Sequence, residues 1–299
     1  MVIVRDLATG AKLRTHHIGK PIYGLAFSPD GQLLAAGCGS QSVDLWTVRE
    51  HEFTQKRSLK CRGDVLAVAF SPSGKMLAAG VQGSGNIHLF DVQSARLRCT
   101  IWEPSNLISS LAFTPDGKTL ASAGSDFKLW DIQPELLAKI ESDRLDLTIE
   151  VLRANGKRAI KWESDFDPEY AAGIAVAPDG KWLATVTGIG GPNTGGKTLS
   201  IWDVPAGRRL KKITSPGMTS VAITPKGQWI VTGSDDGTIR IWDPETGQLK
   251  RQWAAHPKAV RAITLVPGTN RLLTVGADGT FKLWDWSAGE LERSFDANP

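Results

Sequence analysis

The chain has 299 residues, a formal net charge of +4 and 41% hydrophobic residues, with 31 glycines and 11 tryptophans. This hydrophobic fraction excludes a disordered chain, and no run approaches the roughly 18 apolar residues that a membrane-spanning helix needs. The 35 Lys and Arg against 31 Asp and Glu form only short basic runs, which disfavours a dedicated nucleic-acid binder.

In chain order, one pattern occurs six times: an apolar strand that ends in a turn containing proline and glycine. Proline presets the backbone angle at the start of such a turn and glycine adopts the positive φ at its end, so each copy predicts a hairpin. A second apolar strand follows each copy. The six copies of the first strand and its turn are 25–31, 68–74, 111–117, 175–180, 222–227 and the degraded 264–268.

A third strand follows in every unit and alternates apolar with polar residues, which is the period of a strand with one buried face. Each copy carries an aromatic residue, at positions 46, 90, 130, 202, 242 and 284. Successive intervals are 44, 40, 72, 40 and 42 residues. A fourth strand follows, for example at 96–101 and 248–253. Four short strands every 40–45 residues, roughly, are typical of a propeller blade.

The pattern resembles the WD40-repeat family of β-propellers over roughly nine-tenths of the chain. The resemblance implies an all-β, WD40-type propeller that forms a single domain over residues 1–299, and we expect seven blades. In that family a histidine, a turn aspartate and a tryptophan form a buried hydrogen-bond network that rigidifies a blade. By resemblance, His256, Asp278 and Trp284 carry that role. A buried indole N–H and a buried carboxylate both need such partners.

The repeat breaks at 132–165, where the long interval leaves a surplus of about 30 residues. Within it, 147–162 mimics a strand, a turn and the next strand. We therefore interpret 132–165 as a degenerate fourth blade, which raises the six clear repeats to seven, or as a strand-bearing insertion.

Both chain ends also depart from the pattern. Residues 2–6 and 11–16 resemble a third and a fourth strand, so the terminal strands are expected to form a partial blade whose first two strands are missing. Either the ring closes imperfectly or the chain is a fragment of a longer protein. Exposed terminal strands would then allow oligomerisation, because strand edges pair readily with other chains.

A glycine-rich loop fits the phosphate-binding pattern GxxxxGK[ST] with Gly191, Gly196, Lys197 and Thr198. A working P-loop needs a helix N-terminus directly after its lysine, where backbone N–H groups point at phosphate. Here 198–203 is a strand of the repeat. We predict that the motif is a decoy and binds no nucleotide.

Other catalytic signals are not found. The five histidines lack metal-ligand spacing and no nucleophile–base motif is present, so we expect no metal, no cofactor and no enzyme activity. Cys38, Cys61 and Cys99 form no CxxC pair and are expected to be small buried side chains. Because residues 1–6 lack a signal-peptide pattern, the expected location is the reducing cytoplasm.

By resemblance, a partner protein or peptide binds at the top rim and channel mouth, and residues preceding each first strand face that rim. These candidates are Lys20, Arg62, Asp64, Asn106, Tyr170 and Lys258. A polar set with one aromatic residue suits a peptide of acidic character. The expected function is a protein-interaction scaffold or adaptor. A propeller hydrolase with a channel-mouth active site and a weak polyanion binder remain open as alternatives.

Overall fold

The structure, a computed structural model, describes residues 2–6, 9, 11–16, 19–49, 52–83, 86–102, 107–124, 127–132, 160–161, 171–187 and 198–296. These residues contain 26 β-strands and no helix, which confirms the all-β prediction. The chain divides into two compact units, Met1–Lys161 and Trp162–Pro299.

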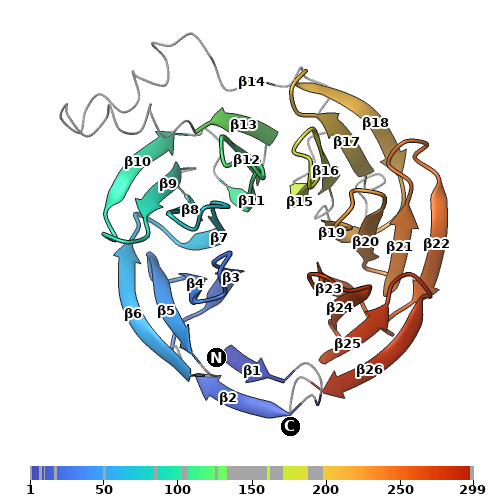
Figure 1. The fold of residues 1–299 in the computed structure, drawn as a ribbon, viewed down its shortest axis with the longest axis horizontal. Coiled ribbons are helices and arrows are strands. Elements are labelled where there is room, and N and C mark those ends of the chain that lie inside the picture. The colour runs from blue at the N-terminus through green and yellow to red at the C-terminus, as the bar shows by residue number, and fades with distance from the viewer. Residues whose placement is uncertain are drawn as a thin grey trace. The chain divides into compact units, whose positions relative to one another are not determined.

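Unit 1 contains one two-stranded sheet and three four-stranded sheets, drawn from blue to green in Figure 1. The two-stranded sheet is formed by β1 (Val2–Arg5) and β2 (Lys12–His16). The four-stranded sheets are formed by β3 (Ile22–Phe27), β4 (Leu33–Cys38), β5 (Ser42–Arg49) and β6 (Glu52–Lys60); by β7 (Val65–Phe70), β8 (Met76–Val81), β9 (Asn86–Asp91) and β10 (Leu97–Trp102); and by β11 (Ile108–Phe113), β12 (Thr119–Gly124), β13 (Phe127–Asp131) and β14 (Ile160–Lys161).

Unit 2 contains three four-stranded sheets. They are formed by β15 (Ala171–Val176), β16 (Trp182–Thr187), β17 (Thr198–Asp203) and β18 (Arg208–Thr214); by β19 (Met218–Ile223), β20 (Ile230–Ser234), β21 (Thr238–Trp242) and β22 (Leu249–Ala254); and by β23 (Val260–Leu265), β24 (Arg271–Gly276), β25 (Thr280–Asp285) and β26 (Glu290–Asp296). In every four-stranded sheet of both units, each strand pairs antiparallel with the next strand along the chain.

The proline–glycine turns explain why consecutive strands pair. In the first hairpin, the hydroxyl of Ser28 accepts the N–H of Leu33 at 2.9 Å and the carboxylate of Asp30 accepts the N–H of Gln32 at 3.0 Å. Gly31 ends the turn at φ +69°, in the left-handed region that favours glycine. These bonds satisfy the turn's own backbone, so the register of the hairpin is set locally.

Apolar side chains fill the space between neighbouring sheets inside each unit. Leu45 and Leu77 belong to one buried cluster that joins sheets β3–β6 and β7–β10 of unit 1. In unit 2, Leu199 and Trp242 belong to a cluster that joins sheets β15–β18 and β19–β22. A sheet with two apolar faces needs such a neighbour on each side, which is why the units repeat the same four-stranded meander.

Seven sheets agree with the predicted seven blades, and the six four-stranded sheets match the six clear repeats. The seventh sheet differs from the one we favoured. It is the terminal pair β1–β2, whereas most of 132–165 lies outside the described residues. The described part, β14, pairs with β13 as the fourth strand of the preceding sheet. This position favours the insertion interpretation, because the surplus lies between the third and fourth strands of one sheet.

Candidate functional site

The segment that precedes each first strand lies beside the turn that joins the second and third strands of the same sheet. In the first full sheet, the N–H of Gly39 in that turn donates to the carbonyl of Pro21 at 2.9 Å. Matching bonds of 2.7 or 2.8 Å run from Gln82 to Asp64, from Asp235 to Gly217 and from Ala277 to Ala259. We call these segments the loop end of the sheets: 19–21, 39–41, 61–64, 82–83, 215–217, 235–237, 255–259 and 277–279.

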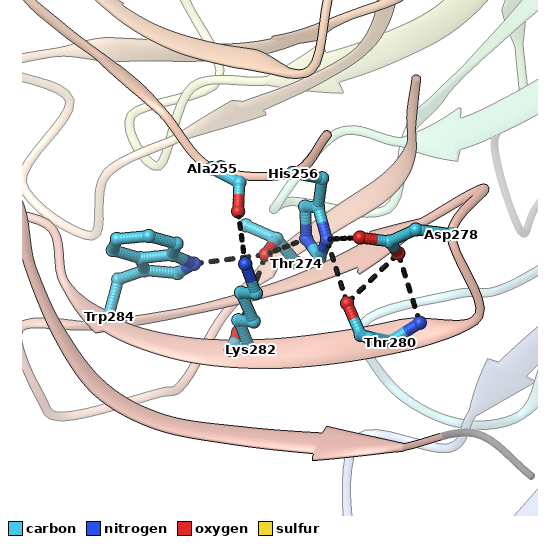
Figure 2. A network of polar contacts seen from close by, with 7 residues as sticks. All are labelled: Ala255, His256, Thr274, Asp278, Thr280, Lys282 and Trp284. Atoms are coloured by element: carbon cyan, nitrogen blue, oxygen red, sulfur yellow. Dashed lines mark hydrogen bonds and ion pairs between the residues drawn. The ribbon is translucent and has the colours of Figure 1, made fainter. Parts of the chain in front are cut away.

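The last sheet holds a chain of buried hydrogen bonds at its loop end (Figure 2). The indole N–H of Trp284 donates to the hydroxyl of Thr274 at 3.0 Å, and that hydroxyl lies 2.7 Å from Nε2 of His256. Nδ1 of His256 lies 3.2 Å from the carboxylate of Asp278 and 3.0 Å from the hydroxyl of Thr280. The contacts therefore join the segment before β23 to strands β24 and β25 and to the turn between them.

The contacts imply one arrangement of protons in this network. The carboxylate of Asp278 only accepts, so Nδ1 of His256 carries the hydrogen and Nε2 accepts from Thr274. Burial lowers the pKa of His256 below its usual 6.5, although the neighbouring Asp278 acts in the opposite direction. Burial works against the charged form of Asp278, but hydrogen bonds from Thr280 and His256 lower the pKa of this carboxyl. The histidine is therefore neutral and the aspartate ionised at neutral pH.

The tryptophan bond to a hydroxyl occurs in four sheets. The pairs are Trp130 with Ser122, Trp202 with Thr185, Trp242 with Thr232 and Trp284 with Thr274, at 2.9–3.0 Å. In sheets β3–β6 and β7–β10 the matching second-strand residues are Ala36 and Ala79, which carry no hydroxyl. In the second of these sheets Phe90 replaces tryptophan, so donor and acceptor are absent together. Those two sheets depend more on apolar packing.

The sequence-predicted rim residues lie on the loop end where the structure describes them. Lys20 and Arg62 are on segments joined through one turn, because Gly39 donates to Pro21 and Cys61 donates to the carbonyl of Gln41 at 2.7 Å. Arg62 is exposed and Asp64 is half-buried. In unit 2, Lys258 is exposed. Asn106 and Tyr170 lie outside the described residues.

A buried partner already holds the charge of Lys20. Its Nζ lies 3.5 Å from the carboxylate of Asp44, whose side chain is 2% exposed. The hydroxyl of Ser58 also donates to Asp44, at 2.7 Å. Within the described part of the chain, neither Arg62 nor Lys258 forms an ion pair. These two cations are therefore more available to a partner than Lys20.

Sequence reasoning missed a second set of residues, which lie inside the third strands, two positions before each aromatic residue. The set is Asp44, His88, Lys128, Ser200, Arg240 and Lys282. Arg240 donates at 2.6 Å both to Asp236 and to Ser234, and Lys282 donates to the carbonyl of Ala255 at 2.7 Å. The sequence signal that could have identified them is one polar residue at the same position of each otherwise apolar third strand. Together with Asp44, which pairs with Lys20, the side chains of Arg240 and Lys282 tie the third strand to the loop end.

The charge of Arg62 acts on one member of this set, His88. His88 lies in strand β9 and is only 3% exposed. Burial lowers the pKa of His88, and the nearby charge of Arg62 lowers it further. The charge of Arg62 therefore acts on a neutral, buried imidazole.

The segment that fits the P-loop pattern lies mostly outside the described residues, since only Thr198 of its four motif positions is described. Thr198 is buried and begins strand β17, as the repeat predicted. Its N–H donates to the hydroxyl of Thr187 at 3.1 Å, and the two hydroxyls lie 2.9 Å apart. The hydroxyl that a P-loop would direct at Mg²⁺ is thus engaged inside the sheet.

The three cysteines are free and buried, as expected. Burial raises the pKa of Cys61 and of Cys99 to about 12, and burial followed by the charge of Asp44 raises that of Cys38. Such thiols stay protonated and are poor nucleophiles. Within the described ranges, no three His, Cys, Asp or Glu side chains are grouped as metal ligands. The same ranges contain no helix that is long and apolar enough to span a membrane.

The chain matches a known protein family over five segments. The family described as "WD domain, G-beta repeat" (WD40) matches residues 10–47, 53–91, 97–131, 207–243 and 247–285. Together these segments cover more than half of the chain. They include strands from all seven sheets, but sheet β15–β18 contributes only β18. The unmatched stretch contains the rest of that sheet and the long interval before it.

Several curated proteins are similar to the chain. THO complex subunit 3 of Arabidopsis thaliana is 22% identical over 229 residues, which cover 75% of this chain and 63% of that protein. WD repeat-containing protein slp1 of Schizosaccharomyces pombe is 24% identical over 76% of this chain and 41% of its own length. Protein HIR1 of Candida albicans is 29% identical over 51% of this chain and 16% of its own length. The chain thus spans less than two thirds of each of these relatives.

Proposed function

Because the chain belongs to the WD domain, G-beta repeat family and has the all-β fold of a WD40-type propeller, we propose that it is a protein-interaction scaffold. It binds an acidic segment of a partner protein at the loop end of its sheets, with Arg62 as the central contact. One relative carries the name of a complex subunit, which fits a role in assembly. No catalytic step is assigned to the chain, and its free thiols fit the proposed reducing, cytoplasmic location.

This proposal rests on the exposure of Arg62, whose charge is available to bind a partner. Its side chain is exposed on a segment whose backbone is fixed by the bond from Cys61 to Gln41, and Lys20 on the neighbouring segment is paired with Asp44. A guanidinium on a rigid base binds a carboxylate through two parallel hydrogen bonds at little entropic cost. The net charge of +4 favours encounter with an acidic partner.

The test is a selection of peptides from a random library on the purified chain, followed by affinity measurements on the selected peptides. We expect Asp- and Glu-rich peptides. Arg62→Glu should weaken their binding by about tenfold or more, because charge reversal turns an attraction into a repulsion. Lys226→Glu is the matched control, since Lys226 is exposed in the β19–β20 turn at the opposite end of its sheet.

Two results would count against the proposal. If Lys226→Glu weakens binding as much as Arg62→Glu, the interaction follows net charge and the chain is a polyanion binder. In that case heparin should compete, with affinity falling steeply as salt increases. If the selection returns no acidic peptides, the assigned partner chemistry is wrong.

A further inference from the structure

Strand β9 carries two buried polar atoms that the described part of the chain leaves unsatisfied. Nδ1 of His88 and Oδ1 of Asn86 are both buried, and neither atom has a hydrogen-bond partner among the described residues. In the last sheet, Lys282 and Thr280 occupy the same two strand positions, and both form hydrogen bonds to the segment 255–259 (Figure 2). A buried polar atom without a partner costs stability, so the pair on β9 requires an explanation.

The alternation of β9 shows which way these two side chains point. Asn86, His88 and Phe90 lie on one face of the strand, and Ile87 and Leu89 lie on the other. Phe90 belongs to the buried cluster that joins this sheet to sheet β3–β6, whereas Ile87 and Leu89 belong to the cluster shared with sheet β11–β14. The ring of His88 meets that of Phe90 edge-on, with the centroids 6.0 Å apart. Asn86 and His88 therefore face sheet β3–β6, above the apolar cluster and toward the loop end.

Arg62 belongs to the same loop end, because its segment 61–64 is held against the turn that leads into β9. The N–H of Gln82 in that turn donates to the carbonyl of Asp64 at 2.8 Å. The effect on His88 agrees with this placement, since burial and then the charge of Arg62 lower the pKa of that imidazole. The loop end of sheet β7–β10 thus combines one exposed cation with two buried, neutral polar groups.

The unpaired atoms restrict the chemistry of an occupant. Oδ1 of Asn86 only accepts, so the occupant must donate, while Nδ1 of a neutral His88 accepts or donates according to its tautomer. A carboxylate donates nothing, and Arg62 repels a cation. A hydroxyl has one hydrogen, so it satisfies both atoms only when Nδ1 is the donor. A primary carboxamide has two N–H donors and a carbonyl on one planar group, so it can satisfy both atoms with either tautomer.

We propose that Asn86 and His88 are specificity-determining residues that bind the carboxamide of an asparagine or glutamine in the partner, next to the carboxylate that binds Arg62. This inference rests on the proposed function, because it takes Arg62 as the contact of the acidic residue. It specifies the partner further, as a segment in which an acidic residue has a carboxamide neighbour. An apolar neighbour of the same shape leaves both buried atoms unpaired and is therefore rejected.

The test uses a synthetic peptide library with one fixed central glutamate and with glutamine, methionine, serine or glutamate at each neighbouring position. Binding to the full chain is measured by fluorescence anisotropy. At one neighbouring position, glutamine should bind about tenfold or more tightly than methionine, which has a similar shape without the polar atoms. In His88→Leu this preference should fall below about twofold. Leucine removes an unpaired buried nitrogen, so this variant should unfold at the same temperature as the parent chain or higher.

A second measurement needs no variant: the ¹⁵N resonance of His88 Nδ1 should shift when the glutamine peptide is added and should stay unchanged with the methionine peptide. Arg62→Glu should remove the requirement for the central glutamate, which tests the proposed function separately. If the glutamate is required but glutamine and methionine neighbours bind equally, this inference is wrong and the proposed function stands. A glutamine preference that persists in His88→Leu, or a stronger preference for serine, also overturns the inference. If glutamine is preferred but Arg62→Glu changes nothing, the proposed function is wrong.

Discussion

Trp284 donates its indole N–H to the hydroxyl of Thr274 at 3.0 Å, so one buried oxygen links the third strand of the last sheet to its second. The same oxygen contacts His256, which brings the loop end into the network. Thr232 makes the same bond with Trp242, but sheet β19–β22 has no histidine at the position of His256. The two threonines therefore differ in how many buried partners they satisfy.

Thr274→Val should destabilise the protein by about 2–3 kcal/mol, because valine keeps the shape but leaves two buried polar partners without a hydrogen bond. Thr232→Val should cost about 1–2 kcal/mol, since only the indole loses its acceptor. Urea denaturation of both variants tests the difference. Equal losses of unfolding free energy in the two variants would show that the contact between Thr274 and His256 adds nothing to stability.

Stability should decrease as the pH falls below about 6.5. Burial lowers the pKa of His256 and of His88 in the folded chain, so the unfolded chain binds protons first as the pH falls through the usual value. The loss begins near pH 6.5 and continues down to the folded-state pKa values. Unfolding temperatures between pH 8 and 5 measure it. His256→Asn should flatten the curve, and an unchanged slope in a His256→Asn, His88→Asn double variant would contradict this explanation.

Lys20→Met should destabilise the protein by about 1–3 kcal/mol, because it leaves the buried carboxylate of Asp44 without its cation. Asp44→Asn removes the charge itself, so the double variant should recover part of that loss. A double-mutant cycle by chemical denaturation measures the coupling. Additive effects would mean that the 3.5 Å contact contributes no net stability.

Phe90→Trp should destabilise sheet β7–β10 by about 1–3 kcal/mol, because Ala79 offers no hydroxyl to the new buried indole N–H. Adding Ala79→Ser should restore at least about 1 kcal/mol by providing the acceptor that four other sheets possess. Thermal unfolding of the single and double variants checks this. If Ala79→Ser gives no recovery in the Phe90→Trp background, packing rather than hydrogen bonding separates these two kinds of sheet.

The sequence predicted most of the strand pattern, because its signals are local. The turn at 28–31 contains its own hydrogen-bond acceptors, and the alternation around Trp46 shows which residues are buried. The boundaries near 132–165 were harder to predict, because strand β14, which pairs with β13, follows it in the sequence only after nearly 30 residues. Periodicity carries no information about where the chain re-enters a sheet after such an interval.

The candidate site was predicted less completely. The residues before each first strand could be identified by counting, but their partners could not. Asp44 is 24 positions from Lys20 and lies in strand β5, whereas Lys20 lies in the segment before β3, so the contact depends on how the loop end is folded. Arg240 illustrates the same limit, because its bonds to Ser234 and Asp236 appear only when the turn brings them together.

The sheets of this protein are each built from consecutive strands, which has a consequence for synthesis. Each complete sheet needs only the residues that have just left the ribosome, except that β13 must wait for β14. Folding can then proceed sheet by sheet from the N-terminus, with short loop closures at each step. Among the complete sheets, β11–β14 is therefore the one whose third strand stays at an open edge longest during translation, because its fourth strand is made nearly 30 residues later.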